Sequence, residues 1–370
     1  MSFTIFQKKI VGATIQLVTE NLNVFNQASR GTILIGTGEV IKENVERMTV
    51  GLIDGLVQDR NEHATIGTTV EPTVLTRLLG GSINSAGRIG PVAIHSGTMR
   101  LIESNVNKAA AEVATLASEA MIQHYIKVAV GSVGAATTQH GMGFYDQEAY
   151  VTGRAGEMYP HMEDFPLAAS VFGDQADSIK AWFMSGTQWA KFSAREVVKS
   201  AKLVFELGNM KIYSDGFGRA IVVSDAVSGA ISGIKSGNNN LYSTDSAVIG
   251  LVPGAVQVTT TETKMAASNI LGRENIENWW QGEFNYAVAV KGSRPTAKFR
   301  QATEGIKTPT LDDLRTVENW ELEKGETDRK PNGNKADPKA PSRNVRETAG
   351  VIMRLSGSLV SAPAQPASGE

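Results

Sequence analysis

The sequence feature that most constrains the fold is a long, alanine-rich helical pattern that begins at Ser104, a residue able to cap a helix, and runs to Val130. At about 1.5 Å per residue, a helix over 104–130 would be ~40 Å long. We expect it to stop at Gly131 and, because alanine is small, to be packed closely by its neighbours. Its apolar residues recur at i, i+3, i+4 and i+7 and form one stripe: Val106, Ala109, Ala110, Val113, Leu116, Ala117, Ala120 and Met121.

A second helical pattern occupies residues 1–30. Thr19 and Glu20 lie on its polar face. Such a helix can dock on the core of its own chain, or it can be an arm that packs on a neighbouring subunit, and the pattern fits both interpretations. The residues of its apolar stripe are Val11, Ile15, Val18, Leu22 and Phe25, spaced four, three, four and three apart.

Between residues 31 and 95 no helical periodicity persists. Short β-prone runs such as TILIG and MTVGLI alternate with glycines, which predicts an extended, hairpin-like excursion. Its charged turn consists of Asp59, Arg60, Asn61 and Glu62. A segment of this length without helices is uncommon inside a compact domain and is often functional.

The second half of the chain reads as a mixed block of short helices and strands, followed by a polar loop over 323–348 and the low-complexity end SAPAQPASGE. One long strand alternates Phe284, Tyr286, Val288 and Val290 on one face. The other expected strands are Ala181–Met184, Met210–Ser214, Arg219–Ser224, Ala247–Val252 and Ala255–Thr260.

Composition and charge exclude several classes of protein and several kinds of site. With 370 residues and 41% apolar side chains, the chain can bury a sizeable core. A formal net charge of −2 disfavours a high-affinity nucleic-acid binder, although a weak, distributed contact stays possible. The absence of cysteine removes disulfides, thiolate metal sites and cysteine nucleophiles. Apolar runs are too short to cross a membrane, so we expect no membrane partner.

A search for chemistry finds almost nothing. The sequence has no phosphate-binding loop, no dinucleotide fingerprint and no hydrolase or metalloprotease motif. The five histidines lie in five separate segments; His161 stands near two acids but is a weak metal candidate, and His124 is expected at a surface or an interface. Asp312 and Asp313 fit the first turn of a helix. We therefore assign no catalytic, cofactor-binding or metal-binding residue and expect a protein that is not an enzyme.

The order of the parts carries a resemblance. The arm helix leads into the excursion through LNVFNQASRGTILI, and GLVQDRNEHAT forms its charged turn. A buried strand followed by a capped helix is written IKAWFMSGTQWAKFS, and a hairpin is written GNMKIYSDGFGRAIVVSDA. Together with the later strand GEFNYAVAVKG, these segments resemble the major capsid protein of tailed double-stranded DNA phages, which has the Hong Kong ninety-seven type of α+β fold.

The resemblance implies a part for each region. Residues of the apolar stripe in the arm, Val11, Ile15, Val18, Leu22 and Phe25, and of the charged turn, Asp59, Arg60 and Glu62, would then make inter-subunit contacts. The implied regions are an N-arm over 1–30, an excursion loop (E-loop) over 31–95, a peripheral domain over 96–135 and 265–356 with the spine helix 104–130, an axial domain over 136–264, and a C-terminal tail over 357–370.

The resemblance also implies function and partners. Copies of the chain would assemble as pentamers and hexamers into an icosahedral shell around the phage DNA, contacted weakly and non-specifically. No cofactor is implied. Partners would be a portal protein, a separate scaffolding protein and a decoration protein, with assembly in the host cytoplasm and a final location in the virion.

Two alternatives stay open from the sequence. An encapsulin-like nanocompartment shell would share the fold, although the long excursion and the C-terminal loop favour a virus. An α/β enzyme with an unrecognised site would instead form a small oligomer.

Overall fold

The protein is described from a computed structural model. The described residues are 2–38, 46–50, 77–94, 106–141, 143–147, 159–195, 202–207, 210–214, 218–261, 263–270, 277–303, 308–325 and 345–355.

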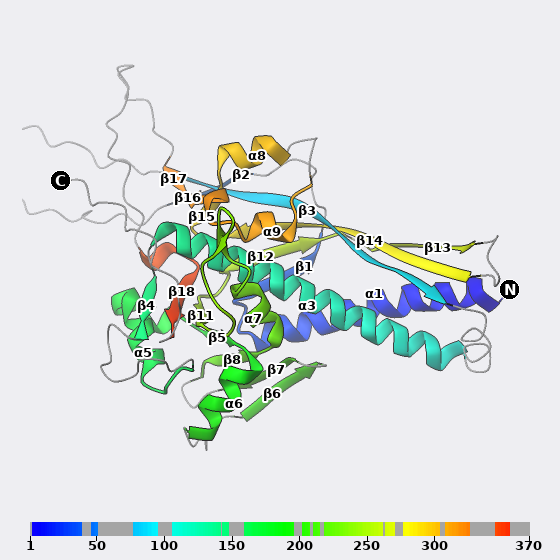
Figure 1. The fold of residues 1–370 in the computed structure, drawn as a ribbon, viewed down its shortest axis with the longest axis horizontal. Helices are drawn as coiled ribbons and strands as arrows, with labels where there is room; N and C mark the ends of the chain where they lie inside the picture. Colours follow the sequence, from blue (N-terminus) through cyan, green and yellow to red (C-terminus); the bar gives the residue numbers. More distant parts are fainter. Residues whose placement is uncertain are drawn as a thin grey trace, which may run out of the picture.

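Two long helices and two large sheets dominate the fold (Figure 1). The α-helices are α1 (Ser2–Ala28), α3 (Val106–His140), α5 (Asp164–Ala169), α6 (Gly186–Arg195), α7 (Asp225–Ile231), α8 (Ala297–Thr303) and α9 (Leu311–Leu314). The 3₁₀ helices among the described residues are η1 (Ser170–Ser178), η2 (Val317–Asn319) and η3 (Val345–Glu347). Helices and strands are both abundant and are not arranged as alternating βαβ units, so the expected α+β class is confirmed.

The first sheet runs in the order β1-β12-β14-β3-β17, with β13 beside β14 and β2 beside β3. Its two longest strands, β3 and β14, pair antiparallel over most of their length and extend beside α1 and α3 (Figure 1). The strands are β1 (Ile33–Thr37), β2 (Glu46–Val50), β3 (Arg77–Ile94), β12 (Val256–Thr260), β13 (Lys264–Ile270), β14 (Glu277–Val290) and β17 (Lys324–Gly325).

The second sheet runs in the order β4-β18-β11-β5-β8-β7-β6. Its strands are β4 (Phe144–Asp146), β5 (Ala181–Met184), β6 (Lys202–Leu207), β7 (Met210–Ser214), β8 (Ala220–Val223), β11 (Ala247–Leu251) and β18 (Gly350–Arg354). The described part also contains two small ribbons, β9 (Lys235–Ser236) with β10 (Asn239–Asn240), and β15 (Ser293–Pro295) with β16 (Trp320–Leu322).

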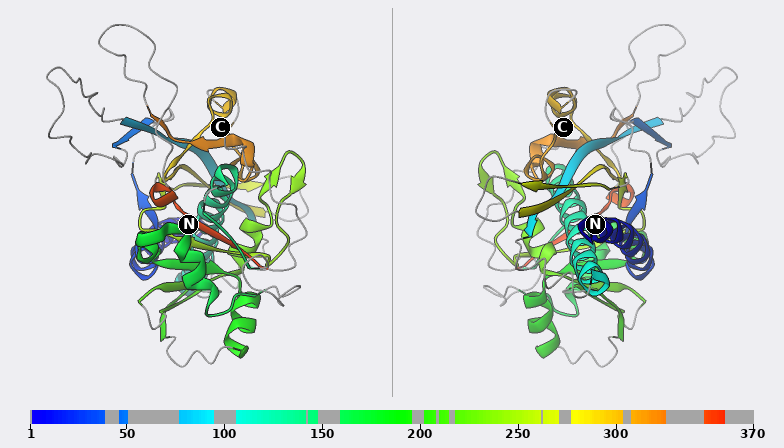
Figure 2. Two further views of the ribbon diagram at one scale, coloured as in Figure 1. Left: turned by 90° about the vertical axis from the view of Figure 1, so that its left-hand side faces the viewer. Right: turned by 90° about the vertical axis from the view of Figure 1, so that its right-hand side faces the viewer.

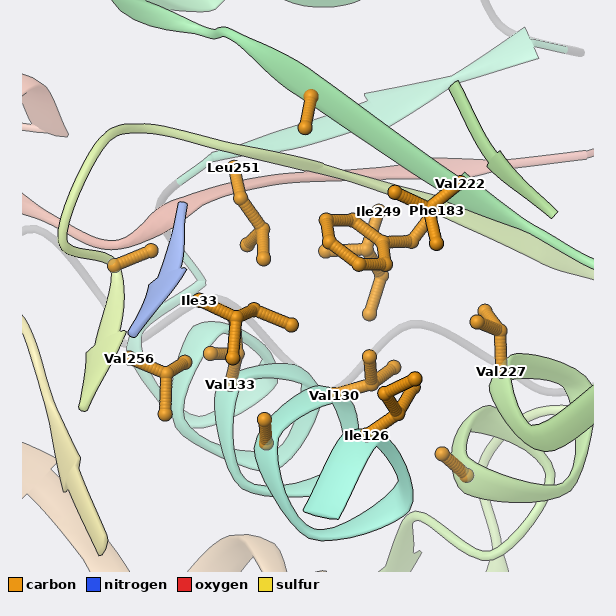
Figure 3. Close-up of a cluster of buried hydrophobic side chains, with 14 of the residues drawn as sticks. Ile33, Ile126, Val130, Val133, Phe183, Val222, Val227, Ile249, Leu251 and Val256 are labelled. Carbon is orange, nitrogen blue, oxygen red and sulfur yellow. The ribbon is translucent and has the colours of Figure 1, made fainter. Parts of the chain in front are cut away.

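One hydrophobic core joins both sheets through α3. Figure 3 shows Ile126, Val130 and Val133 of this helix among side chains from the two sheets. The first sheet contributes Ile33 and Val256, and the second contributes Phe183, Val222, Ile249 and Leu251. The central position of α3 between the sheets explains why its C-terminal half is almost wholly buried.

The long helix differs from its prediction at its end. It continues to His140, ten residues past Val130, with Gly131 and Gly134 inside it. Both glycines stand where another chain segment comes close: a Cβ on Gly131 would lie 2.9 Å from Arg315 Cγ, and one on Gly134 would lie 2.3 Å from Ile234 Cδ1. They allow close packing and do not end the helix.

The apolar stripe of α3 also differs in part. Leu116, expected on the buried stripe, is 66% exposed. Ala110, Ala117 and Met121 of the predicted stripe are buried together with Ala114, at spacings of three and four residues. Ala120, also expected on the stripe, is exposed. Helix α1 packs against α3, and the two lie side by side in the right-hand view of Figure 2.

The predicted strands of the second half are confirmed, and three strands pair across the boundaries of the expected regions. Strand β12 falls in the expected axial region, yet it pairs with β14 of the first sheet. Strand β18 falls in the expected peripheral region, yet it pairs with β11 of the second sheet. Strand β1 was assigned to the excursion, yet it pairs parallel with β12 in the core. Each of the two sheets thus combines strands from more than one of the expected regions.

The free edge of β1 is held by α1. The side-chain amide of Asn26 donates to the carbonyl oxygen of Ile35 at 2.7 Å, and its oxygen accepts from the Ile35 amide at 3.0 Å. This pair of bonds imitates the pairing of a neighbouring strand. It ties the end of α1 to the first sheet.

Candidate assembly surfaces

The apolar stripe of α1 faces the interior of its own chain. Val18, Leu22 and Phe25 are buried and belong to the common core. Ile15 is 37% exposed and lies off the stripe, and the side chain of Val11 lies outside the described part. Of the two interpretations of this helix, docking on its own chain accounts for the buried residues. A role of this helix between subunits stays a prediction and would fall to its outward face.

The buried stripe begins earlier than predicted. Ile10 and Thr14 are buried, so the stripe follows a spacing of four residues through Val18 and Leu22. The Thr14 hydroxyl interrupts the apolar pattern, which is why the sequence favoured neighbouring positions. The spacing of four residues from Ile10 was the signal available.

The charged turn cannot be placed in the same way. Asp59, Arg60 and Glu62 lie outside the described residues, so their role between subunits stays a prediction.

Several large apolar side chains point outward in the described part. Val24 on α1 is 46% exposed, and Leu203 and Val204 on β6 are 47% and 55% exposed. Strand β6 stands at the end of the second sheet, and its pairing with β7 shifts register between Leu203 and Phe205. Exposed apolar side chains are common on single subunits, but their presence on a strand at a sheet edge is typical of a contact surface.

The polar groups of the interior serve packing. His124, expected at a surface or interface, lies instead among aromatic rings, 5.5 Å from Tyr286 and 6.0 Å from Phe284 between ring centroids. Burial, reinforced by Lys127 and Arg315, lowers its pKa, and its Nε2 has no hydrogen-bond partner. His124 therefore contributes to packing within the aromatic cluster.

Two tyrosines are held in the same way. The Tyr125 hydroxyl lies 2.8 Å from Thr260 Oγ1, and burial raises its pKa. Burial raises the pKa of Tyr242 to about 12, and its hydroxyl lies 3.0 Å from Thr138 Oγ1. Both phenols stay protonated at neutral pH, so they hold α3 against its neighbours and do not act as bases.

The acidic candidates have structural partners. Asp164 is fully buried and accepts hydrogen bonds from Tyr145 Oη, Gln147 Nε2 and the His161 backbone amide. Within the described part of the chain, no group of three metal-ligating side chains is found. The prediction for Asp312 and Asp313 is confirmed: both lie in the first turn of α9, where Asp313 forms a capping box with Thr310.

The comparison with family models identifies the class of protein. Residues 2–331 match the model described as Gp13-like, major capsid protein 13-like. This match spans most of the chain, so the chain belongs to the Gp13-like family of major capsid proteins. Its role is structural, as a component of a phage capsid, and the expected resemblance to tailed-phage capsid proteins is confirmed.

Solved structures that resemble the chain are phage capsids. The capsid of cyanophage P-SCSP1u has 12% identity and a TM-score of 0.41, over 70% of this chain and 84% of that one. The capsid of cyanophage Pam1 has 10% identity and a TM-score of 0.42, over 85% and 86%. The capsid of Ralstonia phage GP4 has 10% identity and a TM-score of 0.39, over 71% and 84%. No curated protein matches the chain. None of the described helices is long and apolar enough to cross a membrane.

Proposed function

We propose that copies of this chain assemble as pentamers and hexamers into an icosahedral shell that encloses a double-stranded DNA genome. The observation that carries the proposal is the match to the major capsid protein family over residues 2–331. Closed symmetry repeats each contact between identical chains many times, so contacts of modest strength are enough to hold a shell. A net charge of −2 keeps the repulsion between adjoining copies small.

The fold supports a division of roles. Helix α1 would be the N-arm, and β2 with the long β3 would form part of the E-loop. The other strands of the first sheet with α3 would form the peripheral domain, and the second sheet would form the axial domain around the symmetry axes. The outward apolar residues Val24, Leu203 and Val204 are proposed as contacts between copies.

Further partners belong to the same proposal. A portal protein, a separate scaffolding protein and a decoration protein would join the shell, which would assemble in the host cytoplasm and end in the virion. DNA would touch the inner wall weakly, because a chain with 36 basic and 38 acidic side chains carries no general attraction for phosphate.

The test is to produce the chain alone and together with the other structural proteins of its phage. Size-exclusion chromatography and electron microscopy would then follow the material. We expect capsomers or closed particles with five-fold vertices. A protein that stays a small, discrete oligomer under both conditions would overturn the proposal.

A further inference from the structure

Two segments that connect strands of different sheets meet beside α3. One is the loop and ribbon 233–240, which follows α7 and the second sheet, and the other is 310–319, which leads through β16 into β17 of the first sheet. Helices α7 and α9 flank α3 in Figure 1. We call the contact between these two segments the clasp.

Lys235 makes the first set of clasp contacts. Its ammonium Nζ lies 3.3 Å from Asp312 Oδ2, and its backbone amide donates to the carbonyl oxygen of Arg315 at 3.2 Å. It also forms an isolated parallel bridge with Thr316. One residue thus joins the ribbon to 310–319 through both its side chain and its backbone.

Glu318, which belongs to the segment 310–319, makes the second set of clasp contacts. Its Oε1 accepts hydrogen bonds from the Ser236 hydroxyl and from the Gly237 backbone amide, the latter at 3.1 Å. Gly237 has a φ of +56°, a conformation that glycine adopts without strain. The carboxylate therefore holds the tight turn of the ribbon in place.

Arg315 fixes the centre of the clasp. Only 8% of this residue is exposed, and its side chain lies between two glycines. A Cβ on Gly131 of α3 would lie 3.1 Å from its Nε, and one on Gly233 would lie 2.5 Å from its Nη1. The side chain can occupy this position only while α3, α9 and the loop after α7 keep their present spacing.

The polar part of the clasp adds little to folding. Asp312 is 69% exposed in its side chain, and exposed ion pairs contribute weakly because water and salt screen them. The common core on α3 holds the fold without them. Loss of these contacts should therefore leave the subunit folded.

We propose that the clasp sets the angle between the two sheets and thereby the curvature with which copies meet in the shell. The second half of this inference rests on the proposed function. In a closed assembly of identical chains, a small change of angle within each copy is repeated at every contact, so it changes the size at which the shell closes.

The angle is tested on the soluble subunit. The chain has no cysteine, so spin labels can be attached at Leu203→Cys on β6 and Glu283→Cys on β14, one on each sheet. Pulsed electron resonance should give one narrow distance for this protein. Adding Lys235→Ala and Glu318→Ala should broaden that distance about twofold while the melting temperature stays within ~4 °C. Equal distributions with and without the clasp would overturn the proposal.

The curvature is tested on particles. Lys235→Ala with Glu318→Ala should broaden the distribution of particle diameters about twofold. The matched control is Lys211→Ala, because Lys211 also pairs with an exposed acid, Glu206 at 3.2 Å, but within one sheet. The control should assemble like the unaltered protein. Unchanged diameters beside a broadened label distance would overturn the role in curvature.

A charge exchange distinguishes loss of the ion pair from loss of folding in the double variant. Lys235→Asp alone should broaden both distributions, and Lys235→Asp with Asp312→Lys should restore them. Failure of the exchange to restore either one would contradict the clasp. If the unaltered chain forms no particles, the proposed function fails, and the label distances still decide whether the clasp sets the angle.

Discussion

At the scale of single residues, the two glycines inside α3 show how tertiary contact overrides local preference. Glycine in a helix interior costs about 0.5–1 kcal/mol relative to alanine. Gly131 and Gly134 accept this cost because Arg315 and Ile234 occupy the space of their missing side chains. The helix therefore passes through positions that would usually mark its end.

Replacing Gly131 by alanine should destabilise the protein. The new Cβ would lie 2.9 Å from Arg315 Cγ, and Gly233 on the other side of the guanidinium leaves it no room to retreat. We expect a loss of ~1–3 kcal/mol in the free energy of unfolding, measured by chemical denaturation. Gly12→Ala in α1 is the control, because no atom lies within 4 Å of its new Cβ, and it should stabilise the helix. Equal gains at both positions would contradict this account of Arg315.

His124 should make stability depend on pH. Its pKa is lowered in the folded chain, so below pH ~6.5 the unfolded chain binds the proton more readily. The free energy of unfolding is therefore undiminished by this histidine above the pKa of the unfolded chain. It declines as the pH falls from that pKa towards the lowered pKa of the folded chain. Denaturation at pH 7, 6 and 5 should show a decline that His124→Phe reduces, since the ring fits the aromatic cluster. Parallel profiles for both proteins would show that another group titrates.

At the scale of elements, α1 has two faces with different duties. Phe25 on the inner face is fully buried, so Phe25→Ala should lower the free energy of unfolding by ~3–5 kcal/mol. On the outer face, Val24→Asp should change the free energy of unfolding by no more than ~0.5 kcal/mol. The same variant should nevertheless form no particles in electron micrographs. Asn23→Asp, an exposed neighbour, is the control and should still assemble. Normal particles from Val24→Asp would remove this face from the assembly surface.

Deletion of α1 should therefore destabilise the subunit. A helix that served only as an arm could be removed without harm to the subunit. Because Val18, Leu22 and Phe25 belong to the core, removal of residues 2–26 would expose the α3 surface beneath them. Assembly is therefore better probed by surface substitutions than by truncation.

The sequence predicted which segments form helices and strands better than it predicted which elements pack or pair with one another. Strand Ala181–Met184 matches its prediction, because a short apolar run before a capped helix has few alternatives. The cap of that helix is Ser185, since Ser185 Oγ accepts from the Gln188 amide at 3.1 Å. The clasp was not foreseen, because Lys235 and Asp312 are ordinary surface residues until the fold brings them together.

At the scale of the whole molecule, the chain offers little for covalent linkage between copies. It has no cysteine. Lys42 is the only lysine between Lys9 and Lys108, so it is the only lysine in the expected excursion over 31–95. A lysine with an ordinary pKa near ~10.4 is protonated at neutral pH and attacks amides poorly. Boiled particles in detergent without reductant should give one band near 39.5 kDa. A ladder that disappears in Lys42→Ala would contradict this prediction.

The bond pair between Asn26 and Ile35 matters before the chain is complete. Strand β1 pairs with β12 roughly 220 residues later, which ribosomes need about 10–45 s to add. Throughout that interval β1 has no strand beside it. The contact from Asn26 spans only nine residues, so it can form as soon as α1 has folded. Until β12 has been synthesised, the nascent chain therefore exposes one unpaired edge of β1, where it would otherwise expose both.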